Sequence, residues 1–366
     1  MGTSKQAKPL LAITMGDPAG IGPEIIVKAL QLPQVWRVCR LLVVGHTPVF
    51  ARTASKLAAA LTIDHVSDPD IGESHNIFRR GHLPLLDPFT GATQSFRVGQ
   101  ATANAGNMAV RCIRSAVQLA QSGCVDGIVT APINKEAIHL AGHQYPGHTE
   151  MLAELTETKD SGMLIMGGPL KIFFTTTHMP LRDVAKTLTV SLILKTIRLA
   201  HSGLQQLFGL QKPRIAVAGF NPHAGENGLF GDEETRVILP AIQQGKTQGI
   251  RCHGPYPADT MFAKALTGAF DGIVALYHDQ GLIPLKTVAF GHCVNVTVGL
   301  PILRTSVDHG TAFDIAGKGT ADPTSLVEAI ITAARLAPTF LSSRGQKEKS
   351  KRIRGEGESR EIDFYS

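Results

Sequence analysis

Apolar strand patterns and amphipathic helix patterns alternate along this chain, and this alternation restricts its fold more than any other feature. A short apolar run at residues 10–14 leads into a glycine-rich turn and then into a helix pattern from about Glu24 to Leu30. Further strand patterns cover residues 41–45, 127–130, 170–174, 215–220 and 272–276. Alternation of this kind predicts an α/β architecture with mainly parallel strands, whose ligands bind beyond the carboxyl ends of the strands.

Length and composition limit the class of protein. A chain of 366 residues exceeds what one hydrophobic core usually supports, so we expect about two domains. Aromatic residues make up only 5% and the net charge is +6, which argues against a nucleic-acid partner. Five widely spaced cysteines without a C-x-x-C pair favour a reduced compartment, the cytoplasm. We find neither a signal-peptide core nor an apolar stretch of membrane-spanning length, so no membrane association is expected.

Three histidines stand directly after strand patterns, each within a run of small and polar residues: His178, His223 and His278. Three neutral imidazoles leave a divalent ion free positions for substrate, as catalytic metal sites require. Zinc, magnesium, manganese and cobalt are all compatible with such a set once substrate oxygens complete the shell. Most of the 14 histidines should be ordinary surface or core residues, but three in similar settings predict a metal site.

An anion-binding site is expected where His148 and Thr149 follow a Tyr-Pro-Gly turn and precede a helix pattern. Exposed amides, a hydroxyl and an imidazole at a helix start suit a phosphate or a carboxylate. An ordinary threonine N-cap explains the same motif equally well.

Three further polar residues near the last strand patterns are candidate substrate ligands: Lys286, Asn295 and Arg304. An ammonium, an amide and a guanidinium together suit a substrate that carries both a carboxylate and a phosphate. Taken singly, each is more often a surface or structural residue.

Several common nucleotide and hydrolase motifs are missing. Gly16, Gly20 and Gly22 form G-x-x-x-G-x-G, which differs from the G-x-G-x-x-G dinucleotide fingerprint, so we expect a packing or cleft-lining turn there. The chain also lacks a P-loop and a G-x-S-x-G nucleophile elbow, which removes the simplest support for ATP-driven transfer and for serine hydrolysis.

Six short motifs occur in a fixed order between about Leu10 and Pro338. They are Met15–Glu24, Gly147–Glu150, Thr177–Asp183, Asn221–Glu226, Pro257–Thr260 and Tyr277–Gly281. In these motifs the chain closely resembles the 4-hydroxythreonine-4-phosphate dehydrogenases of vitamin B6 biosynthesis. Close relatives of that family act on erythronate or threonate 4-phosphate, or on a cyclic dihydrodiol dicarboxylate, with much the same metal histidines.

The resemblance implies roles for individual residues. His178, His223 and His278 would hold a divalent metal (zinc, magnesium or cobalt) in a homodimer whose partner chain supplies one ligand. The substrate-binding positions would be His148, Thr149, Lys286, Asn295 and Arg304. The segment 309–319 looks like the loop that holds the adenosine half of NAD in isopropylmalate and isocitrate dehydrogenases. His309, Gly310 and Asp314 would therefore contact NAD or NADP.

The resemblance also implies a domain organisation. Two α/β/α domains of the isopropylmalate dehydrogenase type would enclose the active site in a cleft. We expect a discontinuous first domain formed by residues 1–143 and 316–341. Residues 144–315 would form a second domain with the metal ligands and the dimer interface. A helix should end before Pro338, and residues 342–366, which are charged and glycine-broken, should be a disordered tail.

The implied reaction is oxidation of the C3 hydroxyl of 4-phosphohydroxy-L-threonine by NAD(P). Its product, 2-amino-3-oxo-4-phosphonooxybutanoate, then loses carbon dioxide to give 3-amino-2-oxopropyl phosphate. Lys286 is the first candidate for proton transfer, and Asp259 and Asp279 are weaker ones, since loop capping explains both aspartates as well. The alternatives are erythronate or threonate 4-phosphate oxidation and non-redox metalloenzyme chemistry on a phosphorylated hydroxy acid.

Overall fold

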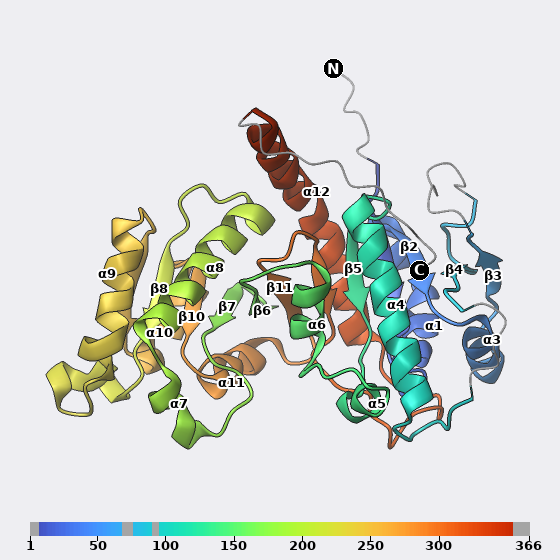
Figure 1. Cartoon of the computed structure of the whole chain (residues 1–366), viewed down its shortest axis with the longest axis horizontal. Helices are drawn as coiled ribbons and strands as arrows, with labels where there is room; N and C mark the ends of the chain where they lie inside the picture. Colours follow the sequence, from blue (N-terminus) through green and yellow to red (C-terminus); the bar gives the residue numbers. More distant parts are fainter. Residues whose placement is uncertain (1–6, 68–75, 90–94, 354–366) are drawn as a thin grey trace. The chain divides into compact units, whose positions relative to one another are not determined.

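The chain folds into two compact α/β units. The structure is a computed structural model that describes residues 7–67, 76–89 and 95–353. The first unit contains the chain up to Glu157 and again from Pro301, and the second unit is Thr158–Leu300 (Figure 1). The α/β class with mainly parallel strands is therefore confirmed.

The first unit is built on six parallel strands in the order β3-β4-β2-β1-β5-β12. Its elements are β1 (Leu10–Thr14), α1 (Gly22–Leu30), α2 (Pro33–Val38), β2 (Arg40–Val44), α3 (Thr47–Lys56), β3 (Thr62–His65), β4 (His82–Leu86), α4 (Ala103–Ser122), β5 (Gly127–Thr130), α5 (Lys135–Leu140), α6 (His148–Leu155), β12 (Arg304–Ser306) and α12 (Thr324–Ile353). Every residue of β1 and β5 is buried, so helices cover both faces, as they do in parallel sheets generally.

The second unit has six strands in the order β11-β6-β7-β10-β8-β9. Its elements are β6 (Gly162–Gly167), β7 (Leu170–Phe174), α7 (Leu181–Thr187), α8 (Val190–Phe208), β8 (Ile215–Ala218), η1 (Pro222–Gly228), η2 (Glu234–Ile238), α9 (Leu239–Thr247), β9 (Cys252–Tyr256), α10 (Ala258–Leu266), β10 (Gly272–Ala275), α11 (His278–Ala289) and β11 (Val294–Val298). β7, β10, β8 and β9 run parallel, whereas β6 is antiparallel to both of its neighbours.

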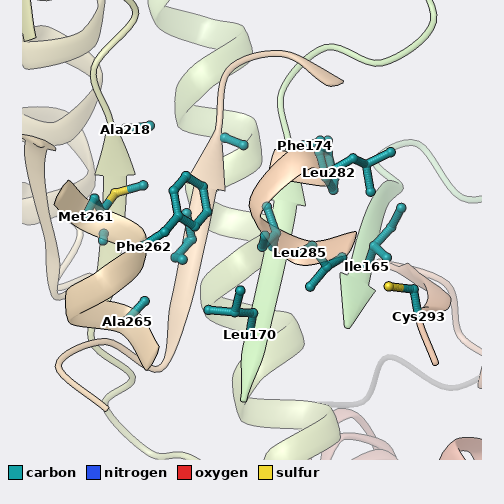
Figure 2. Packing of buried hydrophobic residues seen from close by; sticks show 14 of the residues in the cluster. Ile165, Leu170, Phe174, Ala218, Met261, Phe262, Ala265, Leu282, Leu285 and Cys293 are labelled. Carbon is teal, nitrogen blue, oxygen red and sulfur yellow. The ribbon is translucent and has the colours of Figure 1, made fainter. Parts of the chain in front are cut away.

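One hydrophobic core of the second unit lies between this sheet and helices α10 and α11. Figure 2 shows Leu282 and Leu285 of α11 beside Phe174 of β7 and Ile165 of β6, all of them buried. Gly281, the residue before Leu282, lies so close to Phe174 that a Cβ there would be 2.6 Å from the phenyl ring. This close packing fixes the start of α11 against the end of β7.

The unit boundaries differ from the predicted domain boundaries. Residues 144–157 and 301–315, which we assign to the second domain from the sequence, pack with the first unit. The reason is that β12 completes the first sheet by pairing with β5, Arg304 opposite Ile128. Pairing partners this far apart in the chain leave no local signal in the sequence.

The C-terminal helix is longer than predicted. α12 continues through Pro338 to Ile353, so the expected helix end is wrong. Disorder of the tail stays a prediction, and residues 354–366 lie outside the described part. Within α12, Thr324–Gly345 has the length and composition of a membrane span, which our search of the sequence missed. It is largely buried and contacts β5 and β12, as a core helix of a globular unit does.

Candidate functional site

The three predicted metal histidines follow three neighbouring strands of the second unit. His178 comes after β7, His223 lies in η1 after β8, and His278 begins α11 after β10. β10 lies between β7 and β8 and runs parallel to both, so the three strands end at the same edge of the sheet. All three histidines therefore follow strands, as the sequence predicts.

Two of these histidines, His178 and His278, lie side by side. Their ring centroids are 5.4 Å apart and the ring planes are tilted by 49°. Nδ1 of His278 lies 2.6 Å from Oδ1 of Asp279, a carboxylate contact of the kind that fixes a ligand ring and directs its Nε2 to a metal. Because metal–imidazole bonds are roughly 2 Å long, two rings at this separation fit one cation.

His223 does not join this pair. Across the side chains described in residues 7–67, 76–89 and 95–345, no three His, Cys, Asp or Glu residues are grouped as metal ligands. One chain thus presents two imidazoles that fit a cation and a third that stands apart. A third ligand supplied by a second copy, as the family resemblance implies, remains a prediction.

His223 lies in a turn whose backbone is in the left-handed conformation. Five consecutive residues, 223–227, have positive φ angles of 52°, 54°, 79°, 40° and 56°, and four of them are not glycine. The left-handed conformation costs L-residues roughly 1–2 kcal/mol each, so surrounding contacts must hold such a turn in place.

Glu234 anchors the two residues that lead into this turn. Oε1 of this buried carboxylate accepts hydrogen bonds from the backbone N–H groups of Phe220 and Asn221, both at 2.8 Å. Its Oε2 accepts a third from Nδ2 of Asn221 at 2.9 Å. Sequence reasoning missed Glu234, since it lies outside the motif and has no local pattern of its own.

A second missed residue, Gln280, ties two strand ends together. Its buried amide accepts a hydrogen bond from the N–H of Leu276 at 2.7 Å and donates one to the carbonyl of Gly219 at 2.7 Å. The amide thus joins the segment before His278 to the segment before His223. Its place in the motif Tyr277–Gly281 was the available signal.

The other candidates of the second unit are placed as follows. Lys286 is half-buried on α11, two helical turns beyond His278. Asn295 is the second residue of β11, and its Oδ1 is buried without a hydrogen-bond partner, so a ligand could supply one. Asp259 is exposed in the first turn of α10, where a carboxylate favours the helix dipole without any catalytic role.

In the first unit, Arg304 is buried, His148 is half-buried, and the charge of Arg304 acts on the His148 ring. The Arg304 guanidinium is 2% exposed, and its Nε and Nη2 donate to Oγ1 of Thr130 at 3.2 and 2.8 Å. Burial lowers the pKa of Arg304 to about 9, so it stays charged at neutral pH. Burial, and then the charge of Arg304, hold the pKa of His148 well below its usual range, so this imidazole is neutral.

His148 and Thr149 are the first two residues of α6, so the predicted helix start is correct. The N-cap is Gly147, and no side chain caps the helix, so the N-cap alternative for Thr149 does not hold. The Nε2 of His148 is buried without a hydrogen-bond partner. A charged guanidinium beside an unsatisfied imidazole suits an anionic ligand.

The predicted nucleotide residues lie in the loop between β12 and α12 of the first unit. His309, Gly310 and Asp314 are exposed, and Nδ1 of His309 donates to the carbonyl of Gly310 at 2.9 Å. The loop is anchored to the glycine-rich turn, because the N–H of Ile21 donates to the carbonyl of Thr311 at 3.0 Å.

A second anchor of this loop is Glu24. Its buried carboxylate accepts hydrogen bonds from the N–H groups of Gly319 at 3.1 Å and Ala321 at 2.7 Å. Hydrogen bonds from the glycine-rich turn and the start of α1 therefore hold residues 309–321 in place. That agrees with the packing turn predicted for the three glycines.

Comparison with known proteins agrees with this architecture. A solved structure of 4-hydroxythreonine-4-phosphate dehydrogenase from Klebsiella pneumoniae matches with a TM-score of 0.84 and 44% identity, over 90% of this chain and 100% of that one. A terephthalate 1,2-cis-dihydrodiol dehydrogenase from Burkholderia xenovorans matches with a TM-score of 0.62 and 30% identity, over 90% and 98%. The fold is thus that of a group of dehydrogenases.

Sequence comparison narrows this group to one family. A 4-hydroxythreonine-4-phosphate dehydrogenase of Geobacter metallireducens is 46% identical over 90% of this chain and 96% of its own length. A D-threonate 4-phosphate dehydrogenase of Salmonella typhimurium is 46% identical over 89% and 98%. Residues 37–333 match the family described as "Pyridoxal phosphate biosynthetic protein PdxA". The chain belongs to this family.

Proposed function

We propose that this protein is a metal-dependent, NAD(P)-linked dehydrogenase that oxidises the C3 hydroxyl of 4-phosphohydroxy-L-threonine. The product, 2-amino-3-oxo-4-phosphonooxybutanoate, then decarboxylates to 3-amino-2-oxopropyl phosphate. The observation that carries the proposal is the pair His178 and His278 at adjacent strand ends in a chain of the PdxA family.

The metal is held by His178 and His278, with a third imidazole from a second copy of the chain. A divalent zinc, magnesium or cobalt ion there supplies Lewis-acid chemistry when bound. The Asp279 carboxylate holds Nδ1 of His278, which would leave Nε2 of that ring available to bind the ion.

Arg304, His148 and Thr149 bind an anionic end of the substrate. A guanidinium that is already buried and already bonded to Thr130 loses little freedom when it meets a phosphate or carboxylate. Neutral His148 adds an unsatisfied ring nitrogen without repelling the guanidinium. Fixing that end orients the reacting carbon toward the nicotinamide.

Lys286 and Asn295 complete the substrate site in this proposal. The ammonium of Lys286 stabilises negative charge that develops on the substrate oxygen, or delivers a proton to it. Asn295 binds a substrate donor group through its unpartnered Oδ1. His309, Gly310 and Asp314 hold the nucleotide, NAD or NADP, at the loop mounted on Glu24.

The homodimer is supported by exposed apolar side chains that follow each predicted metal ligand in the sequence. Leu181, three residues after His178, is 67% exposed, and Leu229, six residues after His223, is 72% exposed. Ile283 and Phe290, at 64% and 81%, are exposed on and just after the helix that begins with His278. Exposed apolar side chains that gather in a patch mark a protein interface, and a second copy of the chain would cover them.

A second candidate substrate is D-threonate 4-phosphate, which lacks the 2-amino group. Relatives named D-threonate 4-phosphate dehydrogenase are as similar to the chain as relatives named 4-hydroxythreonine-4-phosphate dehydrogenase. The chemistry at the reacting hydroxyl is the same for both substrates.

The test is a panel of both phosphorylated acids with NAD and with NADP, after chelation and with each metal added back. We expect NAD(P)H absorbance with 4-phosphohydroxy-L-threonine only in the presence of metal, and its loss in His278→Ala with the fold retained by circular dichroism. Faster turnover of D-threonate 4-phosphate would select the alternative. Phosphate release without NAD(P)H formation would instead establish a non-redox metalloenzyme.

A further inference from the structure

A basic cavity lies within the first unit. Its volume is about 430 Å³, at the lower end for small-molecule sites. α3 with its C-cap Leu57 forms one part of the lining and the loop 316–319 forms another. The remaining lining residues are Val98 and Pro18, Gly20, Pro23 and Glu24. Neither His148 nor Arg304 lines it.

Three cations line this cavity: Arg52 and Lys56 of α3, and Lys318 of the loop. In the part of the chain that the structure describes, none of the three forms an ion pair. The acid in the lining, Glu24, is already bonded to Lys28 at 3.0 Å and to two N–H groups of the loop. The cavity therefore has an excess of positive charge for an anionic ligand to neutralise.

Two of the cationic side chains have defined surroundings. The guanidinium of Arg52 lies over the ring of Phe96, 5.2 Å from its centroid, which holds its plane. Nζ of Lys56 lies 3.8 Å from the point where a Cβ on Gly317 would stand, and Gly317 has a φ of +70°. A side chain at 317 would occupy the space beside the ammonium, so glycine there keeps the cavity open.

We propose that this cavity binds the 2′-phosphate of NADP, and that Arg52, Lys56 and Lys318 make NADP the preferred nucleotide. The inference rests on the proposed function, which brings a dinucleotide to the loop that forms one wall. A phosphate monoester carries nearly two negative charges at neutral pH, which suits three unpaired cations. NAD has only the two bridging phosphates with one charge each, and an anionic end of the substrate is already assigned to Arg304 and His148.

The experiment is calorimetric titration of the full chain with NADP, NAD, 2′,5′-ADP and inorganic phosphate, without substrate. We expect NADP to bind at least about tenfold more tightly than NAD, since charge-assisted bonds to phosphate are among the strong ones. Lys56→Ala and Arg52→Ala should each weaken NADP and 2′,5′-ADP by about tenfold and leave NAD unchanged. Arg37→Ala, an exposed cation on α2, is the matched control and should change neither.

Equal affinity for NAD and NADP in the unaltered protein would overturn the proposal, as would equal losses for both nucleotides in the variants. Inorganic phosphate that binds as tightly as 2′,5′-ADP and competes with it would show a free-phosphate site instead. These titrations need no turnover. If NADP binds more tightly than NAD through Lys56, the nucleotide proposal holds even when neither phosphorylated acid is oxidised. If the protein oxidises a substrate but does not prefer NADP, the nucleotide proposal is wrong and the proposed function is unaffected.

Discussion

At the scale of single residues, the first unit contains an acid in an unfavourable environment. Asp17 is fully buried, its Oδ1 accepts one hydrogen bond from the N–H of Ala19 at 2.8 Å, and its Oδ2 has no partner. Burial raises the pKa of Asp17 from 3.8 to about 6, against a smaller opposing effect of the Ala19 bond. The folded chain therefore binds this proton more tightly than the unfolded chain does.

A pH dependence of stability follows. The contribution of Asp17 is fully present below about pH 4 and is lost as the pH rises through about 6, a change on the order of 3 kcal/mol from a shift of about two pKa units. Asp17→Asn cannot titrate, so the free energy of unfolding of the unaltered protein should fall relative to that of the variant across this window. Urea unfolding from pH 4 to 7.5 measures it.

The control is Asp160→Asn, because the Asp160 side chain is 69% exposed. This variant should follow the unaltered protein across the same pH window. A constant difference in unfolding free energy between Asp17→Asn and the unaltered protein at every pH would show that the buried carboxyl does not titrate there.

At the scale of the element, the left-handed turn η1 depends on a carboxylate from the next element. Glu234→Gln replaces one acceptor oxygen with an NH2 group that faces the donor Nδ2 of Asn221, and losing such a buried bond costs about 1–3 kcal/mol. We expect a lower melting temperature and, because His223 lies in the turn, at least about tenfold weaker cobalt binding. Thermal unfolding and the visible spectrum of a cobalt titration measure the two effects.

Asp232→Asn is the matched control, because Asp232 is exposed two residues before Glu234 and, within the described residues, its carboxylate bonds only to Arg236. It should change neither the melting temperature nor the cobalt titration. If Glu234→Gln lowers the melting temperature but leaves cobalt affinity as it was, the carboxylate stabilises the unit without positioning His223.

Individual elements also show what the sequence could predict. Apolar periodicity places the strands, and with them the strand-end positions of His178, His223 and His278, because strand ends are local features. The bonds of Glu234 and Gln280 could not be foreseen, because each depends on how two loops meet. Pro338 misled the prediction of α12: proline often ends a helix, but this helix is held by packing and continues past it.

At the scale of the whole molecule, the separation of His223 from the His178–His278 pair predicts complementation between chains. Chains with His223→Ala and chains with His178→Ala should each be inactive as homodimers. If one chain supplies the pair and the other supplies His223, a mixed dimer contains one intact site. Random mixing makes half of the dimers mixed, so roughly a quarter of the original activity should return.

The measurement is turnover after the two purified variants are mixed, unfolded together and refolded. His223→Ala refolded alone is the control and should stay inactive. If no activity returns although size-exclusion chromatography shows dimers, all three imidazoles come from one chain or are divided differently between the two.

The discontinuity of the first unit has a consequence for biosynthesis. β12 and α12, which complete its sheet and pack against it, are made only after the whole of Thr158–Leu300. During translation the inserted unit therefore has all of its strands before the host unit does. Until the last fifty or so described residues leave the ribosome, one edge of β5 is unpaired. An unpaired strand edge is prone to aggregation, so we expect a chaperone to bind there.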